Sequence, residues 1–284
     1  MRIIRVFPRK TKATPVDDLV RIGKGPDLFD EADEVHISVA FTWDLPRAEW
    51  LAKQWAHIAP VKIGGPATGE RGGDFVPGVY LKPGYVITSR GCPNHCWFCS
   101  VPKREGGAIR ELPITDGHNV LDDNLLACLD DHIRGVFAML ARQKEPIEFT
   151  GGLEAARLKP WHAEEINKLN VKQIFFAYDT PGDRDPLNNA ARIMNEAGFS
   201  LDPRSHSRRL MRCFVLCGFK GNTIPKAEKR MAETRRIGFL PMAMLWRDET
   251  GKRDPEWAKF QREWARPAII YAKTGGANEA KNGN

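Results

Sequence analysis

Residues 92–99 read CPNHCWFC, and this stretch decides how the rest of the chain is interpreted. Its cysteines, Cys92, Cys96 and Cys99, have the spacing C-x3-C-x2-C. Iron–sulfur clusters are normally held by four cysteine thiolates, so three clustered cysteines leave one iron without a protein ligand. An open coordination position is typical of a metal centre that performs chemistry. The motif therefore predicts an iron–sulfur cluster with one reactive iron.

Zinc binding and disulfide formation are the alternatives for these cysteines. His95 could complete a zinc site of three cysteines and one histidine, but structural zinc sites usually combine two separated pairs of ligands. No second C-x2-C pair occurs in the chain. Cysteines this close together leave little room for the geometry of a disulfide. The pattern favours a cluster over both alternatives.

The residues before the motif predict where the cysteines lie in the fold. Residues 85–88 read YVIT, which is typical of a short buried strand. Arg90 and Gly91 then begin a loop, and glycine permits a tight turn of the backbone. The cysteines are therefore expected in a loop that leaves the carboxyl end of a strand, which is where barrel folds place their active sites.

The longer stretch RGCPNHCWFCSVPK, residues 90–103, resembles the cluster loop of radical S-adenosylmethionine (radical SAM) enzymes. The resemblance implies that Cys92, Cys96 and Cys99 bind three irons of a [4Fe–4S] cluster. The amino and carboxylate groups of S-adenosylmethionine would chelate the fourth iron, with the backbone of Phe98 near the adenine. In this family the chemistry belongs to the cofactor, and the protein supplies position and shielding.

The same resemblance implies an activity and a partner. One electron from the cluster would cleave S-adenosylmethionine to methionine and a 5′-deoxyadenosyl radical, which abstracts hydrogen from a substrate. The electron would come from an external reductant of the flavodoxin or ferredoxin kind. The step after abstraction stays open between methylation, sulfur insertion, rearrangement and oxidation, so the enzyme is expected to be an oxidoreductase or a transferase. The sequence does not identify the substrate.

Composition sets broader limits. The chain has 284 residues, 42% of them hydrophobic and 28% charged, which fits a soluble globular protein of one large or two small domains. The beginning is too short and too charged for a secretory signal, and no apolar run is long enough to cross a bilayer. A cytoplasmic protein without a membrane partner is therefore predicted. The net charge of +7 is compatible with a nucleic-acid substrate, with a solvated basic surface as the alternative.

The chain alternates strand-like and helix-like segments, which predicts an α/β fold. Residues 76–270 are expected to form a partial (β/α)6 TIM-like barrel with a helix over 121–143 and a sixth strand near 198–202. Residues 1–75 are expected to form a small Rossmann-like α/β extension, and residues 271–284 a flexible basic tail. The extension resembles the cobalamin-binding-type domain that precedes many radical SAM barrels. Because its D-x-H-x-x-G signature is absent, cobalamin is not predicted.

Further cofactor-binding residues are expected at the strand ends of the barrel. Gly151 and Gly152 resemble the family's Gly-Gly-Glu stretch, which holds the amino group of S-adenosylmethionine, but Leu153 separates them from Glu154. A plain turn between strand and helix is the alternative for these glycines. Gly218 resembles the family's loop that flanks the adenine.

Two further assignments leave alternatives open. Asp179 is expected to accept from ribose hydroxyls, with the alternative that Asp179 or Thr180 caps the turn over residues 181–183. Ser205, with Arg208 or Arg209, is expected to bind the ligand's carboxylate.

Two other hypotheses remain for the cysteines and for the function. A second cluster on the remaining cysteines, Cys128, Cys213 and Cys217, is disfavoured, because cluster sites need more cysteines and unmodified cysteines are commonly buried. The alternative function, from a different class, is a non-catalytic zinc- or nucleic-acid-binding module.

Overall fold

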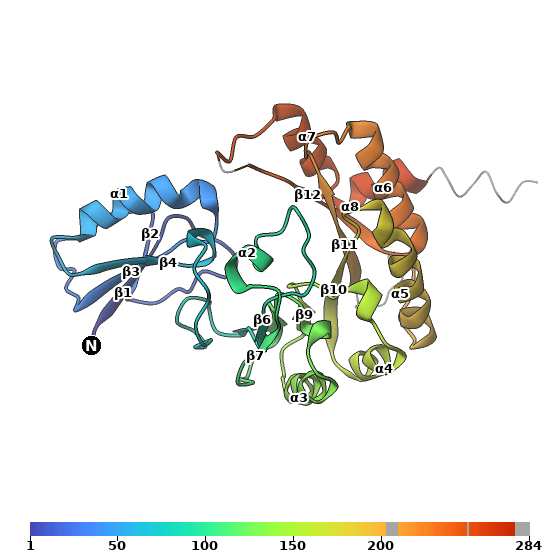
Figure 1. Ribbon diagram of the computed structural model, residues 1–284, viewed down its shortest axis with the longest axis horizontal. Helices are drawn as coiled ribbons and strands as arrows, with labels where there is room; N and C mark the ends of the chain where they lie inside the picture. Colours follow the sequence, from blue (N-terminus) through green and yellow to red (C-terminus); the bar gives the residue numbers. More distant parts are fainter. Residues whose placement is uncertain (203–209, 249, 276–284) are drawn as a thin grey trace, which may run out of the picture. The chain divides into compact units, whose positions relative to one another are not determined.

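The computed structural model describes residues 1–202, 210–248 and 250–275, and the chain divides into two compact units. The N-terminal unit comprises Met1–Gly117 with a short segment near residue 250. The C-terminal unit comprises His118–Asp248 and the part of the chain from Lys252 onward. Figure 1 labels the helices and strands of both units. None of the described helices is long and apolar enough to cross a membrane.

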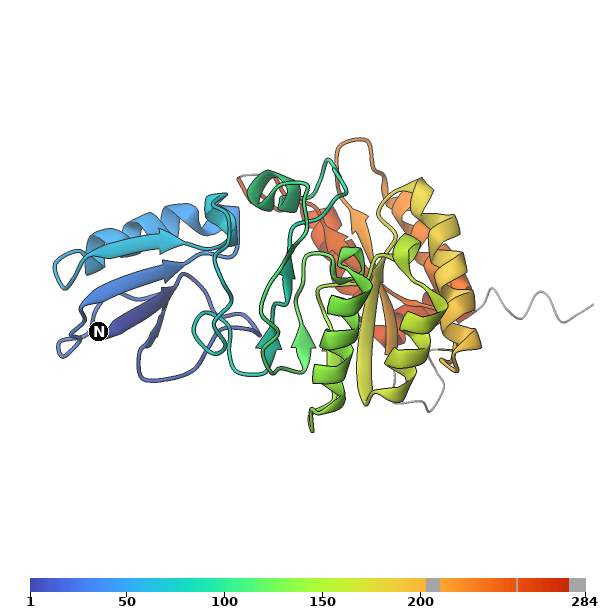
Figure 2. The ribbon, with the colours of Figure 1, turned by 60° about the horizontal axis from the view of Figure 1, so that its bottom comes forward.

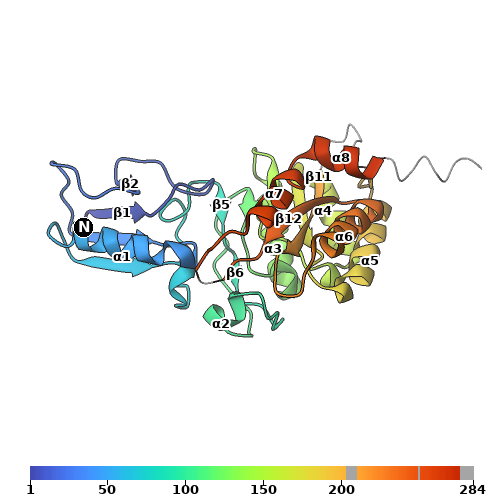
Figure 3. The ribbon, with the colours of Figure 1, turned by 90° about the horizontal axis from the view of Figure 1, so that it is seen from above.

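The N-terminal unit is built on a parallel sheet with the strand order β2-β1-β3-β4. Its elements are β1 (Ile3–Phe7), β2 (Val20–Ile22), β3 (Glu34–Ser38), α1 (Leu45–Trp55) and β4 (Val61–Gly64). Helix α1 lies along one face of the sheet (Figures 1 and 3). After β1 the chain adds β2 on one side and β3 on the other, which makes β1/β3 a topological switch point. In open α/β sheets, ligands bind outside the carboxyl ends of the strands at such a point.

The core of this unit follows from two periodicities. Val35 and Ile37 alternate along β3 and are buried, as expected for a strand with one face on the core. Leu51 and Trp55 lie one helical turn apart on α1 and are fully buried in the same cluster. The indole of Trp55 donates from Nε1 to the carbonyl of Lys24 at 3.2 Å, so its polar atom is satisfied.

The remainder of the N-terminal unit carries the cysteine loop. Its elements are β5 (Tyr85–Val86), β6 (Ser89–Arg90), α2 (Val101–Glu105) and β7 (Arg110–Glu111). Strands β6 and β7 pair antiparallel, with Arg90 opposite Arg110. The cysteines therefore belong to the connection that leaves β6, passes through α2 and returns as β7.

The C-terminal unit is a parallel sheet with helices between its strands. The strands β8 (Asn119–Val120), β9 (Ile147–Phe149), β10 (Val171–Ala177), β11 (Leu210–Cys217) and β12 (Leu240–Leu245) lie in the order β12-β11-β10-β9-β8. The helices are α3 (Asp130–Ala141), α4 (Pro160–Lys168), α5 (Arg184–Glu196), α6 (Ile224–Ile237), α7 (Pro255–Glu263) and α8 (Pro267–Gly275). Helices α3 to α6 contact one another in series along one side of the sheet (Figures 1 and 2). Repeated βα units without closure in the described chain make this a partial, TIM-like barrel, as predicted.

The two faces of this sheet differ. Cys213 and Tyr178 point toward α6, where the Tyr178 hydroxyl donates to Glu233 at 2.9 Å. The opposite face, here called the open face, carries Phe175, Arg212, Phe214, Met242 and Met244 on β10, β11 and β12. Met244 is 40% exposed, so the open face reaches solvent.

Several predicted boundaries need correction. The helix expected over 121–143 begins only at Asp130, because Leu129 has extended backbone angles and Asn124 has φ −162°. The sixth strand expected near 198–202 is absent there, since that stretch is a turn after α5. Strand β8, which was not predicted from the sequence, is only two residues long.

The two compact units can be set beside the domains expected from the sequence. Residues 76–117 group with the N-terminal unit, so the boundary falls after Gly117 rather than after residue 75. Of the expected flexible tail, residues 271–275 belong to helix α8, and the rest lies outside the described residues.

Candidate functional site

The cysteine loop begins at a glycine that no other residue can replace without strain. Gly91 has φ +89°, and a Cβ built on it would lie 2.2 Å from the carbonyl oxygen of Ala108. Cys92 and Cys99 are half-buried, while Cys96 is exposed. The backbone N–H of Cys99 donates to the carbonyl of Cys96 at 3.0 Å, and the rings of Trp97 and Phe98 meet edge to face at 5.4 Å.

A charge cluster lies at the base of this loop. The Glu105 side chain is only 1% exposed and accepts from Arg104 Nε at 2.9 Å. Arg110 approaches the same carboxylate at 3.4 Å and Arg90 at 3.9 Å. Arg90 precedes the cysteines and Arg104 follows them, so one buried carboxylate contacts both flanks of the loop.

The charge cluster also holds a neighbouring backbone segment. The N–H of Gly72 donates to Glu105 at 3.1 Å, and Arg90 Nε donates to the carbonyl of Gly73 at 3.1 Å. Burial alone would raise the pKa of Glu105, but the hydrogen bonds from Arg104 and Gly72 and the charges of Arg104 and Arg90 outweigh it and lower the pKa. Glu105 is therefore an ionised, fully engaged carboxylate.

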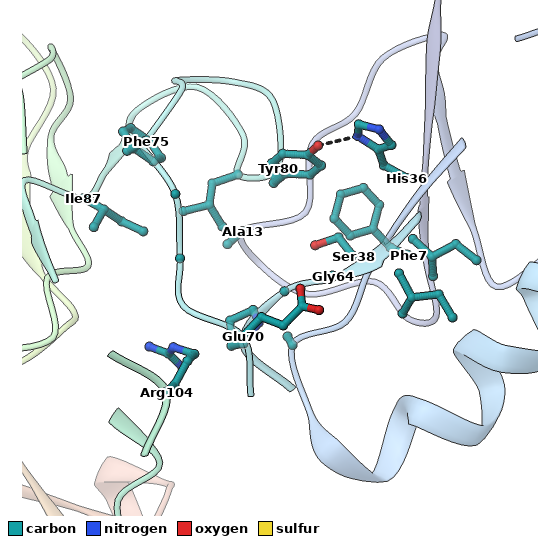
Figure 4. Close-up of a pocket in the computed structure, with 18 of the residues that line it drawn as sticks. Phe7, Ala13, His36, Ser38, Gly64, Glu70, Phe75, Tyr80, Ile87 and Arg104 are labelled. Atoms are coloured by element: carbon teal, nitrogen blue, oxygen red, sulfur yellow. Dashed lines mark hydrogen bonds between the residues drawn. The ribbon is translucent and has the colours of Figure 1, made fainter. Parts of the chain in front are cut away.

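A cavity of about 520 Å³ opens at the carboxyl ends of the N-terminal sheet (Figure 4). Its walls include the last residues of three strands, Phe7 of β1, Ser38 of β3 and Gly64 of β4. The flanks of the cysteine loop contribute Arg104 and Glu105 to the same cavity. The cavity thus lies at the β1/β3 switch point, where sheets of this kind bind ligands.

Polar side chains form a chain at one side of the cavity. Tyr80 OH lies 2.5 Å from His36 Nδ1, as the dashed line in Figure 4 shows. The other ring nitrogen, Nε2, lies 2.8 Å from a Glu34 carboxylate oxygen, which also accepts from Lys62 Nζ. Both nitrogens of His36 are therefore engaged within the protein.

The predicted glycines after β9 occupy a tight backbone crossing. A Cβ at Gly151 would lie 2.5 Å from the carbonyl oxygen of Asp122, and Gly152 has φ +92°. Leu153, which interrupts the Gly-Gly-Glu pattern, is 3% exposed and donates its N–H to the carbonyl of Phe175 at 2.7 Å. Glu154 then accepts from Asn124 at 2.6 Å and from Arg157 at 2.8 Å. The carboxylate of Glu154 is engaged within the C-terminal unit.

Asp179 lies directly after β10 and joins two strand ends. Its Oδ1 accepts from the N–H of Leu216 on β11 at 2.9 Å, and burial raises its pKa to about 6. The turn after it is capped by Asp183, whose Oδ2 accepts from the N–H groups of Asp179 and Thr180 at 2.9 and 2.6 Å. Capping, the role weighed for Asp179 or Thr180, thus falls to Thr180, which forms a capping box with Asp183.

The remaining predicted residues are placed as follows. Gly218 ends β11 with φ +77°, and a Cβ there would lie 2.4 Å from Leu245 Cδ1. Ser205, Arg208 and Arg209 lie outside the described residues. The cysteines lie in the N-terminal unit and the strand-end residues in the C-terminal unit, so each group is described within its own unit.

The other cysteines differ from those of the loop. Cys213 and Cys217 are fully buried on the helix side of β11, and burial raises the pKa of both thiols, to about 12 for Cys217. Thiolates are the form that binds metal, so these two residues are poorly suited as ligands.

The donor set of the cysteine loop fits an iron–sulfur cluster. Three thiols lie on one short loop, and the exposed Cys96 leaves the loop accessible from solvent. In the described part of the chain, no three His, Cys, Asp or Glu side chains are already gathered as a metal site.

Neither the charge cluster nor the cavity was predicted from the sequence. Arg90 and Glu105 are 15 positions apart in the sequence and meet only because α2 folds back under the loop. A glycine pair after a strand, Gly64 and Gly65, was the one local signal for the cavity, since Gly65 has φ +110° and approaches the backbone of Val39.

No family model matches the sequence, and no curated protein matches it. Among solved structures, the chain is similar to the radical S-adenosylmethionine methyltransferase TsrM from Kitasatospora setae, with cobalamin and a [4Fe–4S] cluster bound. The TM-score is 0.60, the identity is 11%, and the match covers 86% of this chain and 74% of that chain. The chain therefore has the fold of a radical SAM enzyme, which is the fold that its cysteine loop implies.

Proposed function

We propose that this protein is a radical SAM enzyme in which Cys92, Cys96 and Cys99 hold a [4Fe–4S] cluster. The observation that carries the proposal is the three-cysteine loop after β6, in a chain whose fold matches a radical SAM methyltransferase. A four-cysteine site gives every iron of the cluster a protein ligand, whereas this three-cysteine loop leaves one iron free to bind another molecule. S-adenosylmethionine is the expected ligand of that iron.

The cofactor and the chain have separate tasks in this proposal. The cluster and S-adenosylmethionine, when bound, supply one-electron cleavage to a 5′-deoxyadenosyl radical that abstracts hydrogen from the substrate. The thiolates of the loop hold the irons, and Gly151 and Gly152 let the main chain approach the amino group of the ligand. Asp179, with a pKa of about 6, is ionised at neutral pH and can accept from ribose hydroxyls. An external flavodoxin- or ferredoxin-like protein supplies the electron.

Anaerobic reconstitution with iron and sulfide tests this function. We expect about four irons per chain, as a single cubane cluster requires, and 5′-deoxyadenosine when a reductant and S-adenosylmethionine are added. Cys96→Ala should lose both, whereas the control Cys128→Ala, at a buried cysteine outside the loop, should keep both. A colourless wild-type protein that retains zinc would instead support a non-catalytic zinc module.

Methyl transfer with a corrinoid is the reaction that the N-terminal unit favours. The cavity at the β1/β3 switch point is the supporting observation, together with the cobalamin of the similar methyltransferase. The chain lacks the D-x-H-x-x-G signature, and both ring nitrogens of His36 are engaged. A corrinoid in this cavity would therefore be held without a cobalt-ligating histidine, and the sequence-based expectation against cobalamin rested on that histidine alone.

Binding of hydroxocobalamin tests the corrinoid. We expect it to co-elute with the protein in gel filtration and to be seen by its visible absorbance. Gly64 lines the cavity, and a Cβ built there meets no atom within 4 Å, so Gly64→Leu should fill the cavity without straining the fold. That variant should bind less corrinoid while keeping the wild-type melting temperature. Equal binding by the variant would place the corrinoid elsewhere.

A further inference from the structure

The open face of the C-terminal sheet carries a partly buried cation, Arg212, for which the described residues supply no counter-ion. Arg212 is half-buried on β11, and its Nε atom is fully buried with no hydrogen-bond partner among the described residues. Burial is the one cause that lowers the pKa of this guanidinium, and no neighbouring carboxylate opposes it. Buried charges in proteins are normally paired, because desolvation of a lone charge is costly.

The acidic side chain of Glu148, on the same face, is already engaged. Glu148 lies on β9, opposite Gln173 of β10, whereas Arg212 is opposite Phe175. The Glu148 carboxylate accepts from Lys172 at 2.8 Å and from Gln173. It therefore lies out of register with Arg212 and has its own donors.

Aromatic rings flank the guanidinium. The Cζ of Arg212 lies 5.3 Å from the centroid of the Phe175 ring, and Phe175 stacks on Phe214 at 4.3 Å with an angle of 11° between the ring planes. Cation–π contact stabilises the charge but leaves the Nε–H donor of the guanidinium without an acceptor among the described residues. The side chains of Met242 and Met244 continue this apolar surface on β12.

We propose that Arg212 binds the carboxylate of a small organic acid whose apolar body packs on Phe214 and its neighbours on the open face. A planar guanidinium pairs with a carboxylate through two parallel hydrogen bonds, which is the complement that the site lacks. The proposal rests on the proposed function and names a substrate class for it. The same chemistry would be satisfied by the carboxylate of S-adenosylmethionine, so the experiment separates the two sources.

A matched pair of probes tests the carboxylate. We expect 3-phenylpropionate to bind the full-length protein at least ten times more tightly than 3-phenylpropan-1-ol, as measured by saturation-transfer NMR. Arg212→Met should remove that difference, whereas the control Arg192→Met, at an exposed arginine paired with Glu196 on α5, should preserve it. Because the measurement needs no iron, it can succeed or fail independently of cluster assembly and of 5′-deoxyadenosine formation.

A second readout separates ligand binding from a structural role. An arginine kept for a ligand costs stability when the ligand is absent, so Arg212→Met should melt at the wild-type temperature or above it. Competition between S-adenosylmethionine and 3-phenylpropionate would assign Arg212 to the cofactor's carboxylate, and simultaneous binding would assign it to the substrate's. Unchanged affinity of Arg212→Met for 3-phenylpropionate would overturn the proposal.

Discussion

The Asp179 carboxylate accepts a hydrogen bond from the backbone N–H of Leu216 at 2.9 Å, which joins the carboxyl ends of β10 and β11. Arg230 adds to this junction by donating to the carbonyl of Leu216 at 2.6 Å and to that of Asp179. The junction contains a carboxylate that burial disfavours in its ionised form, so its protonation affects the stability of the fold.

Asp179→Asn should stabilise the protein at alkaline pH. Burial raises the pKa of Asp179 from 3.8 to about 6, so the stability of the wild type falls as the pH rises between these values. The amide of asparagine keeps an acceptor for the N–H of Leu216 but carries no charge. We expect the free energy of unfolding to rise by about 1–3 kcal/mol at pH 8 and to change little at pH 4. Urea unfolding at both pH values measures it, with Asp185→Asn, at an exposed carboxylate of α5, as control.

His162→Gln should show the opposite pH dependence. His162 is fully buried, its Nδ1 accepts from the N–H of Lys159 at 3.1 Å, and burial lowers its pKa from 6.5 to about 4. The wild type should therefore lose stability as the pH falls between these values. Glutamine retains an acceptor for Lys159 and does not titrate. Between pH 7 and pH 4, the free energy of unfolding should therefore fall by about 2–3 kcal/mol less in the variant than in the wild type, as measured by urea unfolding. The control His57→Gln, at an exposed histidine, should follow the wild-type dependence of stability on pH. If His162→Gln follows it as well, the prediction is wrong.

Glu105→Gln should destabilise the N-terminal unit. Removing one charge from a buried ion-pair network leaves the arginines without their counter-ion, which costs about 3 kcal/mol. Because the pKa of Glu105 is lowered in the fold, its contribution is present above the unfolded pKa of 4.5 and is lost as the pH falls through the folded value. Differential scanning calorimetry at pH 7 should show the loss for Glu105→Gln and no change for Glu31→Gln, at an exposed glutamate of the same unit.

Gly91→Ala should cost more than Gly106→Ala, although both glycines have similar positive φ angles of +89° and +84°. Alanine at either position is strained by about 1–3 kcal/mol. At Gly91 the added Cβ also meets the carbonyl of Ala108 at 2.2 Å, whereas at Gly106 it meets nothing within 4 Å. We expect Gly91→Ala to lower both the melting temperature and the iron bound on reconstitution. Equal effects of the two substitutions would show that the crossing at Ala108 does not shape the loop.

Local signals in the sequence predicted much of the C-terminal unit. Both ends of helix α6 carry such signals, because Thr223 caps its first turn and Gly238, at φ +117°, ends it. Helix α3 was predicted too long, because apolar residues before Asp130 have helical spacing but fold as a short 3-10 turn and an extended residue. Where such a helix begins depends on how the segment packs against neighbouring strands, and a local sequence pattern contains no information about that packing.

The candidate site was predictable only where one short segment carries the chemistry. The cysteine loop was identified from eight consecutive residues. Glu105 and Arg212 gave no comparable signal, because the role of each is defined by partners on other elements or by their absence among the described residues. An arginine in a strand looks like a surface residue until the register places it over Phe175.

The contact between Gly72 and Glu105 has a consequence for how the N-terminal unit responds to ligands. Gly72 is part of the cavity wall, and Glu105 supports the flanks of the cysteine loop. A ligand that shifts this wall would change the affinity of the cysteine loop for metal. By thermodynamic linkage, metal on the loop would then change the affinity of the cavity for that ligand by the same factor. Cavity and loop are thus expected to behave as two thermodynamically linked sites, each reporting the occupancy of the other.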